Sequence, residues 1–265
     1  MPVVGLDLVL DVGNTRTKLA LFQGDRLVKH GPMANHDRTG LAAFIGGVRL
    51  QGIGLGSTAT PDPAFVEHLG TWAPTTVLTG TSPSPLRNAY GTLHTLGADR
   101  LANAVGAVRR FPGRPVLVVD LGTCLTYDLC QADGTYSGGG ISPGLRMRAQ
   151  AMHAYSARLP LVEPAERPPL IGTTTETSLA AGIHFGMLGE LEGYIRRMRN
   201  EHKDLVVVLT GGDALRFVRG LESGIFALPI LTLEGYHALL VHHRSLGGAT
   251  GPAAPHAVDG PGATG

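Results

Sequence analysis

Cysteine, net charge and tryptophan are all scarce in this chain. Only two cysteines, Cys124 and Cys130, occur among its 265 residues, so we expect no disulfide framework and a reducing cytoplasm as the compartment. The 22 Lys and Arg nearly balance the 21 Asp and Glu, and the net charge of +1 lacks the cationic excess typical of nucleic-acid binders. The single tryptophan, Trp72, offers no stacking platform for nucleic acid either.

Long hydrophobic runs are missing as well. No stretch approaches the roughly 18–20 uninterrupted apolar residues of a membrane span. Residues 1–15 contain no basic leader, and Asp7 and Asp11 interrupt their apolar run before a secretory signal could form. We therefore expect a cytoplasmic protein that binds neither a membrane nor nucleic acid.

Two hairpins with the same kind of turn are the main feature that is present. The first joins strands at 3–10 and 18–22 through the turn Asp11-Val12-Gly13-Asn14-Thr15. The second joins strands at 116–119 and 125–129 through Asp120-Leu121-Gly122-Thr123. This internal repeat predicts two similar α/β lobes that face one cleft.

Turn residues mark the limits of the lobes. Prolines and glycine at 112–115 predict a first lobe at 1–112 and a second at 113–245, while residues 246–265, rich in Gly, Ala and Pro, predict a disordered tail. The glycine-rich segment 137–144 is expected to be a functional loop. The remaining patterns predict strands at 26–30, 53–57, 76–79 and 204–209, and helices at 63–69, 98–110, 144–155, 175–200 and 213–218.

The hairpin turns carry groups that suit a phosphate. Backbone N–H groups, a hydroxyl and an amide converge there with Lys18 close by, and Asp11 supplies a hard oxygen for Mg²⁺ or its water shell. Neither a Walker loop nor a dinucleotide fingerprint is present, and the glycine turn of each hairpin leads into a strand where those motifs require a helix. An ordinary hairpin with an Asx turn is the alternative, but two copies could clamp one nucleotide from both lobes.

A third element follows the strand at 204–209. The turn Thr210-Gly211-Gly212-Asp213-Ala214 precedes a helical segment, and a glycine pair at that point can pack its backbone against a base or ribose. A plain strand-to-helix turn is the alternative. The order of the three elements favours the nucleotide interpretation.

These elements, taken together, resemble a known family. The hairpins and the 210–214 turn are similar to those of the acetate and sugar kinase, Hsp70 and actin superfamily. The run Gly97-Ala98-Asp99-Arg100 resembles the Gly-x-Asp-Arg run of type III pantothenate kinases, and residues 138–144 resemble their Gly-Gly-x-Ile-x-Pro-Gly loop. The resemblance extends from about residue 6 to residue 235. It implies an α/β fold of two similar ribonuclease H-like lobes, with mixed sheets flanking a nucleotide cleft, as in actin-like ATPases.

The resemblance also implies an activity. A pantothenate kinase uses ATP to phosphorylate the primary hydroxyl of pantothenate to 4'-phosphopantothenate, the first step of coenzyme A biosynthesis. The implied cofactors are ATP, Mg²⁺ and a monovalent cation, K⁺ or NH₄⁺, and the implied assembly is a homodimer with substrate contacts across the subunit boundary. The implied residues are, for ATP, Asp11, Gly13, Asn14, Thr15, Lys18, Thr123, Gly211 and Gly212; for pantothenate, Tyr90, Gly97, Ala98, Asp99, Arg100 and Thr175; and for the monovalent cation, Asp120.

Some assignments stay open at the level of sequence. Asp99 is implied as the proton acceptor, although an isolated Asp-Arg pair is more often a helix-start aspartate beside a surface arginine. Arg100 could pair with Asp99 or meet the anionic substrate. Residues 172–175 read Gly-Thr-Thr-Thr where the family usually reads Gly-Lys-Asn-Thr, so Thr173 and Thr174 compete with Thr175. Two other functions remain: a kinase or phosphohydrolase for another small substrate, or a non-catalytic regulatory homologue of the accessory-factor type.

Overall fold

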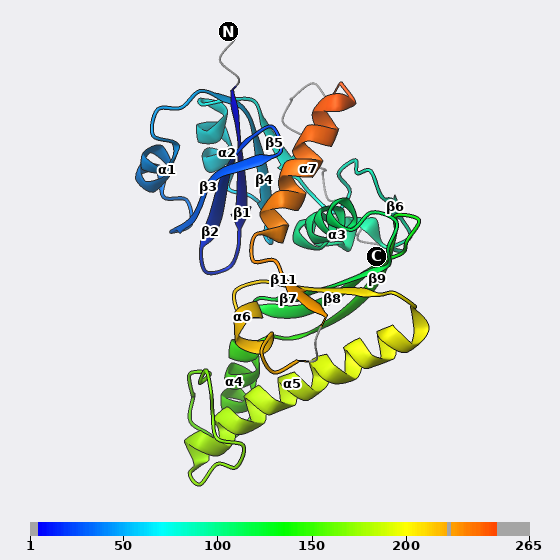
Figure 1. The fold of residues 1–265 in the computed structure, drawn as a ribbon. Coiled ribbons are helices and arrows are strands. Elements are labelled where there is room, and N and C mark those ends of the chain that lie inside the picture. The colour runs from blue at the N-terminus through cyan, green and yellow to red at the C-terminus, as the bar shows by residue number, and fades with distance from the viewer. Residues whose placement is uncertain (1–4, 222–223, 248–265) are drawn as a thin grey trace, which may run out of the picture.

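The computed structural model describes residues 5–221 and 224–247, and two mixed β-sheets organise them (Figure 1). The first sheet has the strand order β3-β2-β1-β4-β5, and the second has the order β11-β10-β7-β8-β9-β6. Read from β9 to β11, five strands of the second sheet have the order β9-β8-β7-β10-β11. This repeats the order of the first sheet, with β7 in the place of β1. The predicted pair of similar lobes is therefore confirmed. The strands are β1 (Leu6–Val12), β2 (Thr17–Gln23), β3 (Arg26–Met33), β4 (Leu50–Ser57), β5 (Thr75–Leu78), β6 (Arg87–Asn88), β7 (Val116–Leu121), β8 (Cys124–Cys130), β9 (Thr135–Pro143), β10 (Val206–Thr210) and β11 (Ile225–Ala227).

Helices cover both faces of each sheet, so the central strands are hydrophobic on both sides. The first sheet buries Leu8 and Leu10 under α1 and α2, and its Val9 faces α7. The second sheet buries one face under α4, α5 and α6 and turns the other toward α3. The helices are α1 (Arg38–Ile45), α2 (Pro63–Gly70), α3 (Ala98–Arg110), α4 (Leu145–Ala154), α5 (Thr175–Glu201), α6 (Ala214–Phe217) and α7 (Leu231–Ser245), with a 3₁₀ turn η1 (Leu93–Thr95).

Two helices are exchanged between the halves of the chain. Helix α3 precedes the second sheet and packs on its strands β7 and β8, whereas α7, near the end of the described residues, packs on β1 and β4 of the first sheet (Figure 1). The two helices also contact each other closely, because Gly235 lies where a Cβ would be 1.8 Å from the carbonyl oxygen of Ala102. Only glycine fits such a crossing. The exchange brings the N-terminal end of α3 between the sheets.

Alternate residues of β4 form a glycine groove for α7. A Cβ at Gly56 would lie 2.0 Å from the Tyr236 ring, and one at Gly52 would lie 3.0 Å from an Arg244 nitrogen. Arg244 closes the contact, since its guanidinium donates two hydrogen bonds of 2.6 Å to the buried carboxylate of Asp7. Burial alone would raise the pKa of Asp7, but hydrogen bonds from His237 and Arg244 lower it. Helix α7 is thus held firmly against the first sheet.

The structure has a strand or a helix at each predicted position, although residues 3–4 of the first predicted strand lie outside the described residues. It corrects one prediction. Residues 137–143 belong to strand β9, so the expected functional loop is wrong there. Glycine is required in that strand because a Cβ at Gly139 would lie 1.7 Å from the carbonyl oxygen of Tyr127. Helices α1 and α7 were not predicted. The lobe boundary at residue 112 stays a prediction. Two elements make contacts across that boundary: α7 packs on the first sheet, and β6 pairs with β9 of the second sheet.

Two further predictions concern the ends of the chain and membranes. Residues 248–265, most of the predicted tail, lie outside the described residues. Across 5–221 and 224–247, no helix combines the length and the hydropathy needed to cross a membrane.

Candidate functional site

The first hairpin places its polar turn at the end of two buried strands. The N–H of Gly13 donates to the carbonyl of Arg16 at 3.2 Å, and Asn14 and Thr15 are exposed at the tip. Asn35 braces this turn, because its Nδ2 donates to the Gly13 carbonyl at 2.8 Å. The Asn35 contribution was not predicted, since it comes from a separate segment after β3. The turn is therefore braced from outside the hairpin, and its tip is exposed.

The second hairpin and the glycine turn after β10 form one unit. Gly122 N–H donates to the carbonyl of Cys124 at 3.0 Å, and the Asp213 N–H donates to the carbonyl of Leu121 at 3.1 Å. Gly211 has φ +89° and lies where a Cβ would be 2.4 Å from an Asp120 oxygen. Glycine is therefore required at that position. Thr123 and Gly212 are exposed, so both predicted contacts face solvent beside the same carboxylate.

A relay of hydrogen bonds holds Asp120 from the side of the helices. Asn103 of α3 donates from Nδ2 to Asp120 Oδ2 at 2.9 Å, and Thr232 of α7 donates to Asn103 Oδ1 at 2.9 Å. Asn103 is fully buried. Sequence reasoning missed both residues, although a lone Asn among the apolar residues of a predicted helix was an available signal. One oxygen of Asp120 remains uncommitted to this relay.

Three carboxylates lie close enough to one another between the sheets to interact through their charges. Asp11 and Asp120 are the next-to-last residues of β1 and β7, and Asp99 is in the first turn of α3. The pKa of Asp11 is raised to about 6, mainly by burial and also by the charges of Asp99 and Asp120. Lys18, whose Nζ is 3.8 Å from Asp11 Oδ2, opposes this rise. Burial likewise raises the pKa of Asp120 to about 6, with an opposing hydrogen bond from Asn103. Such a group attracts cations.

Arg100 pairs with a residue that was not among the predicted partners. Its Nη2 lies 2.7 Å from Asp128 Oδ1, and its Nε donates to the same oxygen at 2.9 Å. Only 5% of Arg100 is exposed, so it is not the surface arginine of the alternative interpretation. Asp99 Oδ1 instead accepts the Arg100 backbone N–H at 2.9 Å. Burial would lower the pKa of Arg100, but Asp128 more than offsets this and raises it.

Tyr90 also contacts Arg100. The Arg100 guanidinium carbon is 5.4 Å from the centre of the Tyr90 ring, and Nη1 donates to Tyr90 Oη at 3.4 Å. Tyr136 Oη donates a hydrogen bond to Asp128 Oδ1 at 2.6 Å, the same oxygen that Arg100 contacts. The structure thus brings Tyr90, Gly97, Ala98, Asp99 and Arg100 together. Asp128 and Tyr136 were missed, because their connection to Arg100 depends on the pairing of β8 with β9.

Thr175 is not near these residues within one chain. It is the first residue of α5, and that end of the helix lies beside α4 at the far tip of the molecule (Figure 1). Thr173, Thr174 and Thr175 line a cavity of about 620 Å³ with Met152 and Leu159. Thr174 is the N-cap of α5, since its side chain accepts the Thr177 N–H. Its hydroxyl is therefore engaged, and Thr173 and Thr175 remain exposed.

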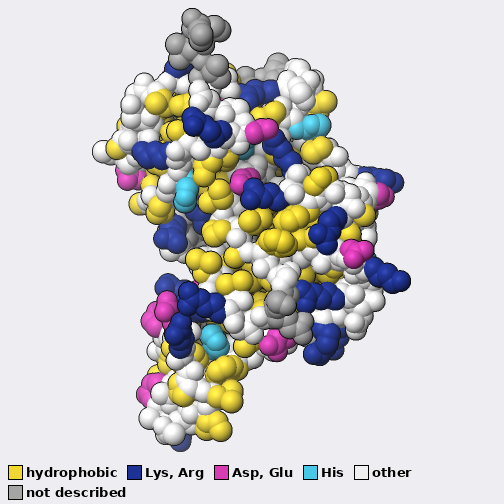
Figure 2. Space-filling model, in the orientation of Figure 1, with side chains coloured by type: hydrophobic (Ala, Val, Ile, Leu, Met, Phe, Trp, Pro, Cys, Tyr) yellow, Lys and Arg dark blue, Asp and Glu magenta, His cyan; other side chains and the backbone are white. Residues whose placement is uncertain are grey.

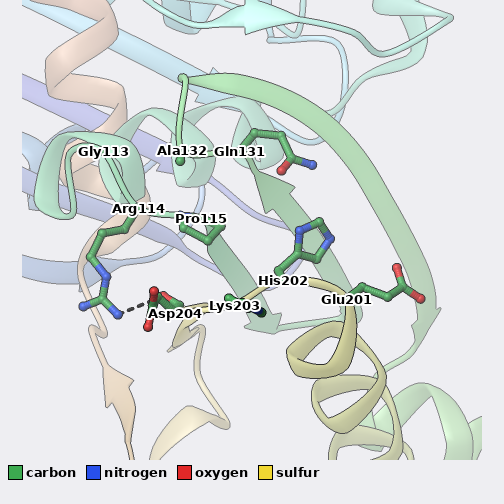
Figure 3. A pocket seen from close by; sticks show the side chains of 9 residues that line it. All are labelled: Gly113, Arg114, Pro115, Gln131, Ala132, Glu201, His202, Lys203 and Asp204. Carbon is green, nitrogen blue, oxygen red and sulfur yellow. Dashed lines mark hydrogen bonds between the residues drawn. The ribbon is translucent and has the colours of Figure 1, made fainter.

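Another cavity, of about 570 Å³, contains none of the predicted site residues (Figure 3). It is lined by residues before β7 and β10 and after β8, among them Arg114, Gln131 and Lys203. Arg114 donates to the Asp204 carbonyl at 2.8 Å across it. This edge of the second sheet is opposite to the one that carries Asp120.

Comparisons with known proteins point to one family. The model of the type III pantothenate kinase family matches residues 7–197. The type III pantothenate kinase of Bacteroides fragilis is 38% identical over 240 residues, which cover 90% of this chain and 99% of that relative. That of Christiangramia forsetii is 38% identical over 244 residues, with coverages of 91% and 100%.

Solved structures share the fold at low identity. A Campylobacter jejuni protein that carries the name of a Baf family transcriptional activator has a TM-score of 0.57 at 16% identity, covering 90% of this chain and 99% of that one. The activator of 2-hydroxyisocaproyl-CoA dehydratase from Clostridium difficile, with bound ADPNP, has a TM-score of 0.50 at 12% identity, with coverages of 94% and 100%. These likenesses concern the fold alone, and they confirm the predicted actin-like ATPase fold. The family match and the two relatives show that this chain belongs to the type III pantothenate kinase family.

Proposed function

We propose that this chain is a pantothenate kinase, which transfers the γ-phosphoryl group of ATP to the primary hydroxyl of pantothenate. The observation that carries the proposal is that Asp11, Asp99 and Asp120 interact electrostatically between the sheets, with Arg100 adjacent to Asp99. The activity is that of a phosphotransferase with an alcohol acceptor, and it opens coenzyme A biosynthesis. Membership of the family supports it independently.

The two hairpins and the glycine turn form the ATP site in this proposal. Phosphoryl transfer requires positioning and neutralisation of charge more than covalent help. Lys18 and the backbone N–H groups at the exposed tips bind phosphate oxygens, and the backbone of 211–212 packs against the adenosine. The ATP contacts are Asp11, Gly13, Asn14, Thr15, Lys18, Thr123, Gly211 and Gly212.

Asp99 is the proposed proton acceptor for the hydroxyl of pantothenate. It is half-buried at the start of α3, where its charge interacts with those of Asp11 and Asp120. Arg100 and Tyr90 form the wall behind it, and the fixed guanidinium suits a polar, anionic substrate. Asp99 orients the hydroxyl toward the γ-phosphate and accepts its proton late in the transfer.

The oxygen donors at the site fit the implied cations. Within 5–221 and 224–247, no group of three His, Cys, Asp or Glu side chains could hold a metal ion. A Mg²⁺ ion commonly binds to one or two carboxylates together with substrate phosphates and water, so Asp11 with ATP suffices. Asp120 keeps one oxygen free of Asn103 for K⁺ or NH₄⁺. When bound, these cations supply neutralisation of the phosphate charge.

We also propose a homodimer, in which Thr175 reaches the Asp99 pocket of the second copy. Large apolar side chains gather at the tip formed by α4 and the segment before α5, where Figure 2 shows hydrophobic surface. Tyr155 is 92% exposed, Ile171 78% and Leu170 72%. A patch of this kind beside Thr175 is typical of an interface.

The free thiols of Cys124 and Cys130 suit the proposed cytoplasmic location.

The decisive assay is ADP release from the purified protein with ATP and Mg²⁺, with and without pantothenate, in potassium and then in sodium buffer. We expect release that depends on pantothenate and is faster in potassium. Folded protein that releases no ADP with pantothenate, but does so with another small hydroxyl compound, would move the assignment to that substrate. The non-catalytic regulatory alternative is not favoured, because the curated relatives are named as kinases.

A further inference from the structure

Tyr236 is a buried residue of the cleft that the proposed mechanism does not use. It lies on α7, none of it is exposed, and its ring is seated over Gly56 at the end of β4. Its hydroxyl has no hydrogen-bond partner among the described residues. The large buried tyrosines of the second sheet differ in this respect, because Tyr127 donates to Glu190 and Tyr136 donates to Asp128.

An unpaired buried hydroxyl is costly, because it has given up its hydrogen bonds to water. A phenylalanine ring would fill the same groove of β4 without this cost. Such a buried, unpaired group calls for an explanation. One explanation is that the group gains its hydrogen-bond partner only when a ligand binds. The position of Tyr236 suggests that explanation.

The Tyr236 ring lies beside the strand that carries Asp11. Gly56, under its ring, is the register partner of Asp11 in the pairing of β4 with β1. Burial raises the pKa of Tyr236 well above its ordinary value, and the charges of Asp11, Asp99 and Asp120 add to this, with Asp11 the strongest. The hydroxyl is therefore neutral and is available as a hydrogen-bond donor.

We propose that Tyr236 is a positioning residue of the phosphate cleft. When nucleotide is bound, its hydroxyl donates a hydrogen bond to the Asp11 carboxylate, directly or through one water, and so fixes the direction in which Asp11 faces the phosphates. This inference rests on the proposed kinase function only for its kinetic readout. Its binding readout needs ATP alone.

The test is Tyr236→Phe, which keeps the ring and removes the hydroxyl. We expect the Tm of the free protein to stay equal or rise by a few degrees, because an unpaired polar group is removed. We expect the rise in Tm caused by Mg²⁺ and a non-hydrolysable ATP analogue to shrink. The KM for ATP should rise roughly 3- to 10-fold, the loss of one hydrogen bond, with the KM for pantothenate unchanged.

Tyr194→Phe is the matched control, because Tyr194 stacks on Tyr127 on the face of the second sheet that is turned away from Asp120. It should leave the nucleotide-induced rise in Tm unchanged. A wild-type nucleotide response in Tyr236→Phe, or a clear fall in the Tm of the free variant, would overturn the inference. If wild-type protein binds ATP but never phosphorylates pantothenate, the proposed substrate fails while the thermal comparison still decides the role of Tyr236.

Discussion

Arg100 and Asp128 form an ion pair that is buried between α3 and the second sheet, with Nη2 and Oδ1 2.7 Å apart. Asp128 is fully buried and receives further hydrogen bonds from Thr126 and Tyr136, so the carboxylate cannot turn away. The pair fixes the Arg100 guanidinium next to the Tyr90 ring. Arg100 directly follows Asp99 in the sequence. The wall of the proposed pantothenate pocket therefore depends on a residue that does not itself reach the substrate.

Asp128→Asn should destabilise the protein by about 3–5 kcal/mol, because it leaves a buried guanidinium without its counter-charge. It should also raise the KM for pantothenate more than the KM for ATP, since Arg100 loses its fixed direction. Urea unfolding and steady-state kinetics measure the two effects. Asp133→Asn is the control: Asp133 pairs with Arg87 at the surface, and its loss should leave both measurements unchanged.

Asp99→Asn should lower turnover by about 10²- to 10⁴-fold, the usual contribution of a positioned general base. The amide is isosteric, and Asp99 uses an oxygen to accept the Arg100 N–H, so folding should be preserved. Binding of pantothenate and ATP, measured by calorimetry, should change little. Turnover at the wild-type rate would remove Asp99 from its role as proton acceptor.

Activity should fall as the pH drops through about 6. Burial raises the pKa of Asp11 and of Asp120 to about 6, and both need to be ionised to bind cations. The acidic limb should appear in kcat/KM, which reports the free enzyme, and less in kcat, because bound cations favour the ionised form. A kcat/KM that is constant from pH 7 to pH 5 would contradict this.

The same carboxylates should affect stability in the opposite sense. Their folded pKa lies above the unfolded value of 3.8, so their contribution to stability is fully present below that value and is lost as the pH rises through about 6. In the ligand-free protein, Asp120→Asn should flatten the pH dependence of the free energy of unfolding between pH 4 and 6. Denaturant titrations of both proteins across that range measure it, and parallel curves would refute the assignment.

Local motifs explain which parts of the site the sequence could predict. The hairpin at Asp11, its repeat at Asp120 and the start of α3 at Asp99 are short runs whose turn and capping residues determine their shape. Asn103 and Thr232 meet Asp120 only because α3 and α7 cross, a contact between distant segments. The glycines of β9 indicated a loop locally, yet the strand needs them because neighbouring backbone lies too close for a side chain.

Gly56→Ala should destabilise the protein by about 1–3 kcal/mol, the usual cost of overpacking. Its Cβ would lie 2.0 Å from Tyr236 and would push α7 out of the groove of β4. Gly70→Ala is the matched control, because nothing lies within 4 Å of a Cβ there. Chemical denaturation should separate the two variants, and equal midpoints would show that α7 does not depend on the groove.

Mixing two inactive variants should restore activity if the substrate site is shared between subunits. Asp99→Asn removes the proposed proton acceptor but keeps Thr175, and Thr175→Lys blocks the threonine contact but keeps Asp99. Thr175 is exposed at the start of α5, so the lysine should be tolerated. In a mixed dimer, one of the two sites combines an intact Asp99 with an intact Thr175 of the second copy.

Random reassociation of equal amounts should recover about a quarter of the wild-type activity per chain, because half of the dimers are mixed and each has one complete site. Each variant alone provides the baseline, and a mixture measured before subunits exchange provides the control for simple addition. If Thr175 instead served the Asp99 pocket of its own chain, every site in every dimer would carry one defect. No activity would then return, and the proposed crossing of the subunit boundary would be wrong.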